Sequence, residues 1–371
     1  MELLYQIGLT LINGVGDVTA KNLVAYCGSA EAVFKEKKSR FLKIPGIAAK
    51  TADLLLNEIN NKALLKRAEE EIEFIENNKI TPLFYTDEAY PQRLKYCSDG
   101  PTLLYFKGDT NLNAERVISV VGTRTPTAYG KQVVEDFIAE LKGSGILVLS
   151  GLAYGIDVMA HKAALESGLD TVGILAHGLD RVYPSLNEPV ANKMLKQGGL
   201  LTEFMNGTIP DKENFPKRNR IVAGMCDALI VVESKMKGGS LITAEIANSY
   251  NKDVFAFPGR NNDEFSSGCN GFIKRNKAIL IESAADLLYV MVWDDTKNPD
   301  KKNKKSQLPL LIDLNEKEQS IVDSLKDKTG VHIDEICTVA QLSMSEAAGL
   351  LLQLEFSNIV KSLPGKIYSL N

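Results

Sequence analysis

Three stretches of β-branched and aliphatic residues each end in a glycine-containing turn that leads into a helix. They are 117–121 before Gly122-Thr123-Arg124, 146–149 before Ser150-Gly151, and 229–232 before Gly238-Gly239-Ser240. Such turns leave backbone N–H groups and helix N-termini at one edge of a parallel sheet, where they can bind phosphate. Four cationic side chains could add positive charge there: Arg124, Arg218, Arg220 and Lys237. The spacing therefore predicts a polyanion site at this edge.

The segment 215–224 combines a proline typical of a first helical turn with three cations. The cations are Lys217, Arg218 and Arg220, and Asn219 lies between the two arginines. Cations near a helix N-terminus oppose the helix dipole, and a bound anion would compensate for them. Alternatively, Arg218 or Arg220 pairs with an internal carboxylate such as Glu203 or Glu233. We expect one arginine to be structural and the other to meet the ligand.

Signatures of nucleotide hydrolysis, dinucleotide binding and zinc chemistry are missing from the sequence. The segment 122–131 has the wrong interval for a Walker A motif, and Gln132 stands where Ser or Thr would hold magnesium. No GxGxxG pattern follows the first predicted strand of the parallel sheet. None of the three histidines has HExxH spacing. We expect no cofactor and no metal.

One group of residues could in principle be catalytic. Asp157 and His161 lie four residues apart on a predicted helix, so they share a face, and Ser150 precedes that helix. However, Ser150 is not in a GxSxG turn, and the chain order differs from that of hydrolases with this turn. The residues favour a structural role that ties the helix to its neighbours.

Composition limits where the protein works. The 371 residues include 43 Lys and Arg against 47 Asp and Glu, so binding to nucleic acid would need a local basic patch. Five widely spaced cysteines without a CxxC pair are typical of a reducing compartment. Neither a signal sequence nor an apolar run long enough to span a membrane is present. We expect a cytoplasmic protein with no membrane association.

Residues 1–80 are predicted to be helical, because apolar residues recur at helical spacing. Two glycine-containing breaks, 13–16 and 44–47, resemble tandem helix-hairpin-helix (SAM-like) motifs, in which glycine amides and a following lysine touch DNA phosphates. A helical bundle that uses glycine only to turn is the alternative.

Residues 81–293 alternate strand and helix. Beyond the three strands above, strands are predicted at 171–175, 200–203, 254–257 and 278–281. Helices are predicted at 128–142, 156–167, 215–224 and 241–249. This alternation indicates an α/β domain with a doubly wound, mostly parallel sheet.

Residues 294–309 are rich in charged and polar residues and are predicted to be a linker. The order of helices and strands in residues 310–371 resembles a winged helix. Its third helix, 343–356, would be the recognition helix of a DNA reader, yet it contains no Lys or Arg. A protein-contacting role is therefore favoured for this domain.

Several separate motifs, in the same order, are similar to those of the DNA-processing protein A family (DprA, also called Smf). They are 122–124, 150–157 with His161, 178–180 with 183–184, 215–224, 238–245, 257–259 and 268–270. The resemblance implies an extended Rossmann domain that binds single-stranded DNA, protects it, and loads the RecA recombinase onto it during natural transformation. It also implies a homodimer formed through this domain and no catalysis.

The resemblance assigns the first glycine turn to the DNA-binding pocket and places the cationic helix and the third turn at or beside it. The complete predicted DNA-binding set is Gly122, Thr123, Arg124, Ser150, Gly151, Lys217, Arg218, Asn219, Arg220, Lys237, Gly238, Gly239 and Ser240.

Two alternatives remain at this point. Residues 238–245 are also similar to the PGGxGTxxE signature of the lysine-decarboxylase-like phosphoribohydrolases, which would make the chain a nucleotide-processing enzyme. Arg220 and Glu245 would then be its catalytic pair. A scaffold protein built around the acidic C-terminal domain is the other alternative.

Overall fold

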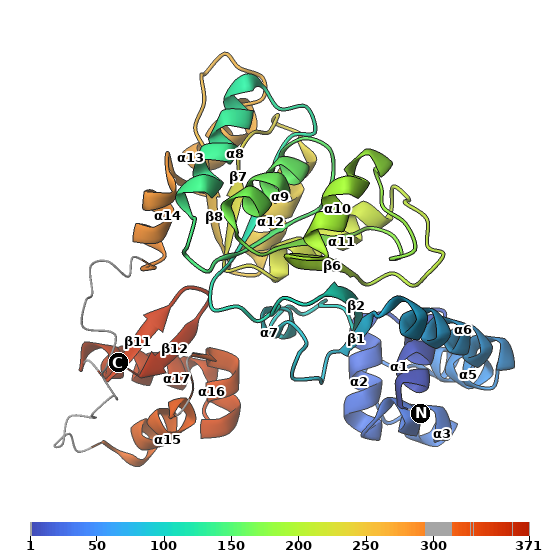
Figure 1. Ribbon diagram of the computed structural model, residues 1–371. Helices are drawn as coiled ribbons and strands as arrows, with labels where there is room; N and C mark the ends of the chain where they lie inside the picture. Colours follow the sequence, from blue (N-terminus) through green and yellow to red (C-terminus); the bar gives the residue numbers. More distant parts are fainter. Residues whose placement is uncertain (1, 294–313, 327, 329, 358, 371) are drawn as a thin grey trace. The chain divides into compact units, whose positions relative to one another are not determined.

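The computed structural model describes residues 2–293, 314–326, 328, 330–357 and 359–370. The chain divides into two compact units, residues 1–250 with 254–284 and residues 251–253 with 285–371 (Figure 1). Within the described residues, the larger unit holds a group of N-terminal helices and a nine-stranded sheet, and the smaller unit holds a three-stranded sheet. The predicted linker 294–309 lies outside the described residues.

Helices fill the N-terminal part of the larger unit, as the spacing of apolar residues predicted. Their bounds are α1 Glu2–Leu11, α2 Asp17–Cys27, α3 Ala30–Lys35, α4 Lys38–Phe41, α5 Ala49–Ile59 and α6 Lys62–Asn78. Leu23, Phe41 and Leu55 are completely buried in their shared core. Gly14 and Gly46 have φ angles of 77° and 84°, a region that favours glycine because it has no Cβ. The chain turns at both predicted hairpins.

A mostly parallel sheet forms the centre of the larger unit. Its strands are β1 Thr81–Phe84, β2 Leu103–Gly108, β3 Val117–Val121, β4 Leu147–Ser150, β5 Thr171–Ile174, β6 Gly198–Thr202, β7 Ala228–Val231, β8 Asp253–Ala256 and β9 Ile279–Leu280. They are arranged in the order β1-β2-β6-β5-β4-β3-β7-β8-β9. Strands β6 to β3 and β7 are parallel, whereas β1 and β2 form an antiparallel hairpin that joins β6. The prediction of an α/β doubly wound sheet is confirmed.

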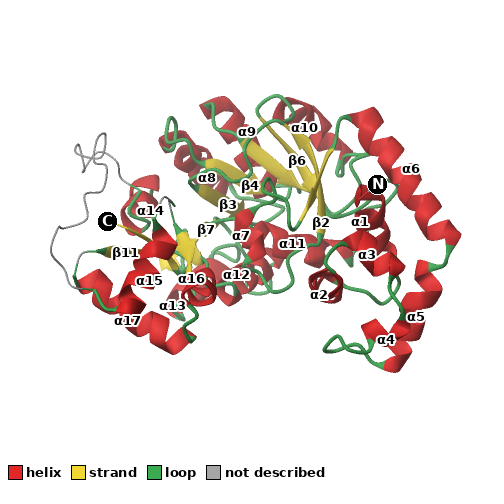
Figure 2. Ribbon diagram, turned by 90° about the horizontal axis from the view of Figure 1, so that it is seen from below, coloured by secondary structure: helices red, strands yellow, loops and turns green. Residues whose placement is uncertain are grey.

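Helices cover both faces of this sheet, with α8, α9 and α10 on one side and α11 and α12 on the other (Figure 2). The helices of this region are α7 Gln92–Lys95, α8 Ala128–Glu140, α9 Ile156–Ser167, α10 Glu188–Met194, α11 Asn214–Gly224, α12 Gly239–Ser249 and α13 Ser267–Lys274, with a 3-10 turn η1 at Ser185–Asn187. Every residue of β3, β4 and β7 is buried, as expected of strands that helices cover on both faces.

The chain changes direction across the sheet between β3 and β7. From β3 it proceeds through β4 and β5 to β6, and then it returns to the other side of β3 to form β7. Ligands of open α/β sheets bind outside the carboxyl ends of the strands at such a switch point. The glycine turn after β3 and the loop after β7 meet there.

The described part of the smaller unit has the element order of a winged helix. It contains α14 Ala284–Val290, α15 Glu316–Leu325, β10 Val331–His332, α16 Ile333–Ala340, α17 Met344–Phe356, β11 Val360–Leu363 and β12 Ile367–Leu370. Capping boxes begin two of the helices, from Asn315 with Glu318 and from Ser343 with Glu346. The sheet order β10-β12-β11 is antiparallel. The winged-helix prediction is confirmed. In the described ranges, no helix has the length and apolarity needed to cross a lipid bilayer.

Candidate nucleic-acid interface

A cavity of about 540 Å³ opens at the carboxyl ends of β3 and β7. Its volume lies within the ~300–1,000 Å³ usual for ligand sites. Residues from four separate segments line it: Val121, Gly122, Thr123, Arg124, Gly151, Ala153, Asp157, Phe215, Arg218, Asn219, Val222, Ser234, Lys235, Lys237, Gly238, Gly239, Ser240 and Thr243. Ten of the thirteen residues predicted from the sequence are among them. The structure thus brings the glycine turns and the cationic helix together.

The turn after β3 is held in place by packing and by a buried carboxylate. A Cβ on Gly122 would lie 2.5 Å from the side chain of Ile156, so only glycine fits this close approach to α9. Glu233, at the end of the strand region of β7, accepts hydrogen bonds from the Thr127 N–H at 2.9 Å and from its hydroxyl at 2.6 Å. These bonds fix the loop that carries Arg124.

One face of α11 forms a wall of the cavity. Phe215, Arg218, Asn219 and Val222 are spaced three or four residues apart and therefore face the same way. Arg218 is only 5% exposed, and its guanidinium group donates hydrogen bonds to the carbonyls of Gly151 and Ile174. Burial lowers the pKa of Arg218, and the buried carboxylate of Asp157 opposes that shift.

The N-terminus of α12 supplies amides to the same cavity. Gly238 is the N-cap residue, and the first N–H groups of a helix have no partner within the helix. They make the cavity wall at Gly239 and Ser240 suitable for an anion. Ser240 also donates a 2.9 Å hydrogen bond to Ser234, which ties the helix start to the loop after β7.

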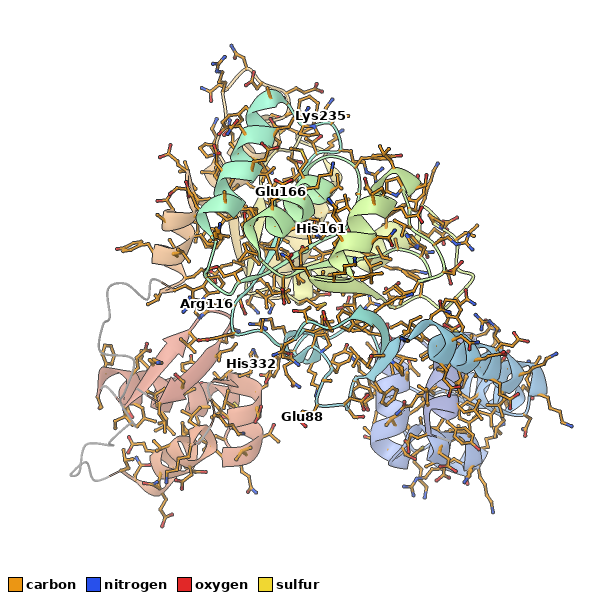
Figure 3. All side chains as sticks on the ribbon, in the orientation of Figure 1. Glu88, Arg116, His161, Glu166, Lys235 and His332 are labelled. Carbon is orange, nitrogen blue, oxygen red and sulfur yellow. The ribbon has the colours of Figure 1, made fainter. Side chains whose placement is uncertain are left out.

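Two exposed cations line the cavity, Arg124 and Lys237. In the part of the chain that the structure describes, neither Arg124 nor Lys237 forms an ion pair. Arg124 lies over the ring of Phe215, 5.5 Å from its centroid. Lys235, labelled near the upper edge of the domain in Figure 3, instead pairs with Glu264 at 2.9 Å. Positive charge without an internal partner is available to a ligand.

Three predicted residues lie outside the lining of this cavity. Ser150 is buried and donates a 2.6 Å hydrogen bond to the Val120 carbonyl, and Lys217 is exposed. Arg220 forms ion pairs with Glu203 and, at 3.2 Å, with Asp17. The structural alternative raised for this arginine, a pair with Glu203, is therefore present, and Arg218 is the arginine that reaches the cavity.

The histidine of the possible catalytic group has a structural partner at its Nδ1 atom. His161 is completely buried, and its Nδ1 lies 2.7 Å from the Thr171 hydroxyl, which itself donates to the Val148 carbonyl. Nδ1 therefore carries the proton of this hydrogen bond. Burial lowers the pKa of His161 to about 3, so the ring is neutral near pH 7. Among the described residues, no cluster of His, Cys, Asp or Glu is placed to hold a metal ion.

Aromatic side chains gather next to the cavity. A hollow of about 40 Å³ beside the cavity is lined by Tyr154, Tyr183 and Phe215, together with Arg124. The ring centroids of Tyr183 and Phe215 are 6.3 Å apart. Tyr183 comes from the loop before η1, which is separate in the sequence from Tyr154 and Phe215. Only the folded chain places it here.

The cation that follows the first N-terminal hairpin is used within the protein. Lys21 donates a 2.6 Å hydrogen bond to the carbonyl of Gly100, and its pKa is lowered by burial. Asp17, at the start of the same helix, accepts from the Thr102 N–H at 2.7 Å. This hairpin thus packs on the sheet domain. Whether the second hairpin touches DNA stays a prediction.

Comparison with known proteins identifies the class. The sequence profile of the DNA recombination-mediator protein A family matches residues 81–291, that of the SAM-like helix-hairpin-helix tandem matches residues 7–61, and that of the DprA winged helix domain matches residues 305–366. The chain therefore belongs to the DNA recombination-mediator protein A family, also known as DprA or Smf.

Individual relatives agree with this assignment. Protein Smf of Synechocystis is 29% identical over 99% of this chain and 98% of its own length. The crystal structure of DprA from Streptococcus pneumoniae matches with a TM-score of 0.66 at 33% identity, over 77% of this chain and 97% of that chain. DprA from Helicobacter pylori matches with a TM-score of 0.53 at 30% identity, over 58% and 97% of the two chains.

Proposed function

We propose that this DNA recombination mediator binds single-stranded DNA in the cavity between β3 and β7. The observation that carries the proposal is that Arg124 and Lys237, two cations without an ion pair in the described ranges, flank the amides at the start of α12. A polynucleotide backbone combines the negative charge and the acceptor oxygens that such a site can bind. The Helicobacter pylori relative is described as having a single-stranded DNA binding mode, which supports the same ligand here.

The site has parts for both the backbone and the bases. The N–H groups of Gly239 and Ser240 would donate to phosphate oxygens, and Arg124 would neutralise charge. The rings of Tyr154 and Tyr183 are 45% and 48% exposed next to this position, so unpaired bases could stack on them. Duplex DNA keeps its bases stacked inside and offers no such contact. These features favour single strands with little sequence preference.

We further propose that the protein protects incoming DNA and loads RecA onto it during natural transformation, in the cytoplasm and without catalysis. The family supports the general role. The cytoplasm fits five cysteines that all lie in the described part of the chain and form no disulfide there. A homodimer through the sheet domain is supported by the edge strand β9, whose Ile279 and Leu280 are 41% and 47% exposed.

The phosphoribohydrolase alternative is not favoured. Its catalytic pair would be Arg220 and Glu245, but Arg220 is held by Glu203 and Asp17. Glu245 instead pairs with Lys277 on the surface. The enzyme would release free base from nucleoside monophosphates, so robust turnover in such an assay would contradict the proposed function.

Binding to fluorescent oligothymidine, followed by anisotropy over a range of salt concentrations, tests the proposal. We expect Arg124→Ala and Lys237→Ala each to weaken binding several-fold and to lower the salt slope by roughly 0.7, the value for one phosphate contact on a single strand. Lys142→Ala serves as the control, because Lys142 is an exposed lysine just beyond the C-terminus of α8. Equal affinity for wild type and both cavity variants would refute the site.

A further inference from the structure

A larger groove adjoins the candidate DNA cavity. It has a volume of about 980 Å³ and lies between the start of α8, one side of α9, and η1 with α10. Its lining is Arg124, Thr125, Pro126, Lys131, Tyr154, Gly155, Val158, Met159, Lys162, Leu165, Glu166, Leu186, Asn187, Pro189, Val190 and Lys193. Neither the predicted DNA-binding residues nor the family motifs account for most of these side chains.

The charges along this groove are almost all positive. Lys131 comes from α8, Lys162 from α9 and Lys193 from α10, so three separate elements each contribute one exposed lysine. Glu166, labelled in Figure 3, is the one carboxylate in the lining. Within the described ranges, none of the three lysines forms an ion pair. Cations that converge from three elements without internal partners create a potential that attracts an anion.

The floor of the groove is apolar. Val158, Met159 and Leu165 lie on the side of α9 that faces it. At its rim, Leu186 is 76% exposed and Tyr154 is 45% exposed. Exposed apolar side chains that gather in one patch commonly mark a binding site. An apolar floor with cations around it suits a ligand with flat apolar faces and a charged backbone.

The groove is continuous with the candidate DNA site. Arg124 lines the central cavity, the aromatic hollow and the groove. Tyr154 lines both the hollow and the groove. A strand that leaves the central cavity past Arg124 would therefore enter the groove that Tyr154 and the three lysines line.

We propose that the groove along α9 is a second nucleotide-binding stretch, which holds the continuation of the single strand bound in the central cavity. The proposal rests on the proposed function. The lysines would contact successive phosphates, and bases would lie against Tyr154, Met159 and Leu186, because every base has an apolar face that stacks without sequence preference. A protein segment could use the apolar floor, but four cations against one carboxylate fit a polyanion better.

Oligonucleotide length separates the two stretches. An oligothymidine of about six nucleotides would fill the central cavity, whereas one of about twenty would also occupy the groove. We expect Lys162→Glu with Lys193→Glu to weaken binding of the long strand about tenfold and to leave the short strand within about twofold. Its salt slope for the long strand should fall by roughly 1.4, the value for two phosphate contacts.

Two further variants distinguish failure of the groove from failure of the site. Lys237 lines only the central cavity of the two, so Lys237→Glu should weaken both strands. Lys66→Glu with Lys142→Glu reverses two exposed charges elsewhere and controls for net charge. If the groove variant binds the long strand like wild type, or if its affinity for both strands falls equally, the groove proposal is wrong. The proposal for the central cavity is unaffected by either result. Wild-type protein that binds neither strand overturns both proposals.

Discussion

Two parts of this chain occupy places where their folds commonly hold nucleic acid, and their side chains differ. At the carboxyl edge of the nine-stranded sheet, Arg124 and Lys237 have no ion pair in the described ranges and stand beside helix amides. The third helix of the winged helix, α17, has no Lys or Arg, and Glu346 is in its first turn. The comparison teaches that a fold supplies a position, whereas the side chains at that position decide what binds.

The surface of α17 suits a protein rather than DNA. Met344, Leu352 and Phe356 are 47%, 53% and 83% exposed. Leu352 and Phe356 are four residues apart, so these two share one face of the helix. A major-groove helix needs donors to phosphates and base edges, and these side chains have none. The protein-contacting role of this domain therefore remains our proposal.

The same contrast occurs within α11. Arg218 and Arg220 are two residues apart, so their side chains point about 200° apart around a helix of 3.6 residues per turn. Arg218 reaches the cavity, and Arg220 meets Glu203 and Asp17 on the other side. One arginine lines the cavity, and the other joins the N-terminal helices to the sheet.

The largest effect is expected from a methyl group at the sheet edge. A Cβ on Gly151 would overlap the guanidinium group of Arg218, which is buried against it. Gly151→Ala should lower the free energy of unfolding by about 3 kcal/mol and weaken single-strand binding at least tenfold. Urea unfolding and anisotropy measure the two effects.

Gly239→Ala is the matched control for the unfolding measurement, because a Cβ there meets nothing within 4 Å. It should be as stable as wild type. If Gly151→Ala also matched wild type in stability and affinity, Arg218 would not be fixed against Gly151. The sheet edge would then differ less from α17 in its suitability for binding DNA.

An effect of intermediate size is expected for Glu203, the internal partner of Arg220, in the pH dependence of stability. Burial, together with Asp17, raises the pKa of Glu203 to about 7, although Arg220 opposes the shift. The folded protein then holds a proton that the unfolded chain releases near pH 4.5. Stability should therefore fall by on the order of 2 kcal/mol as the pH rises from about 4.5 to 7.

Glu203→Gln should abolish this part of the pH dependence, because the amide does not titrate. Urea unfolding at several pH values, for wild type and variant in parallel, measures the difference. Two identical pH profiles would show that Glu203 is ionised throughout and that its pair with Arg220 dominates over burial.

The features of the fold that the sequence predicted are those that depend on local patterns. The strands β3, β4 and β7 and the turns after them were found because apolar runs and glycines act within a few residues. The antiparallel hairpin of β1 and β2 was not predicted. Nor was the pairing of β2 with β6, because β6 lies about a hundred residues further on. The helix α17 was also predicted nearly to its end residues, and the capping residue Ser343 that begins it is a local feature of this kind.

In the candidate site, too, some features follow from local sequence patterns and others from the packing of distant segments. Ten cavity residues came from motifs that are contiguous in the sequence. The partner of Arg220 in the N-terminal helices, Asp17, and the approach of Tyr183 to Phe215 depend on how distant segments pack. Helical spacing alone could have shown that Arg218 and Arg220 face opposite ways. It could not have shown which of them faces the cavity.

The smallest effect on DNA is expected from α17 itself. Leu352→Ser with Phe356→Ser removes exposed apolar side chains from a helix that has no cation to offer phosphate. We expect single-strand affinity within about twofold of wild type and stability within about 0.5 kcal/mol. Leu351→Ser, at the neighbouring completely buried position, should instead unfold the winged helix, which separates a surface effect from loss of the fold. A tenfold loss of affinity in the double variant would place α17 in the DNA site and end the contrast between the two regions.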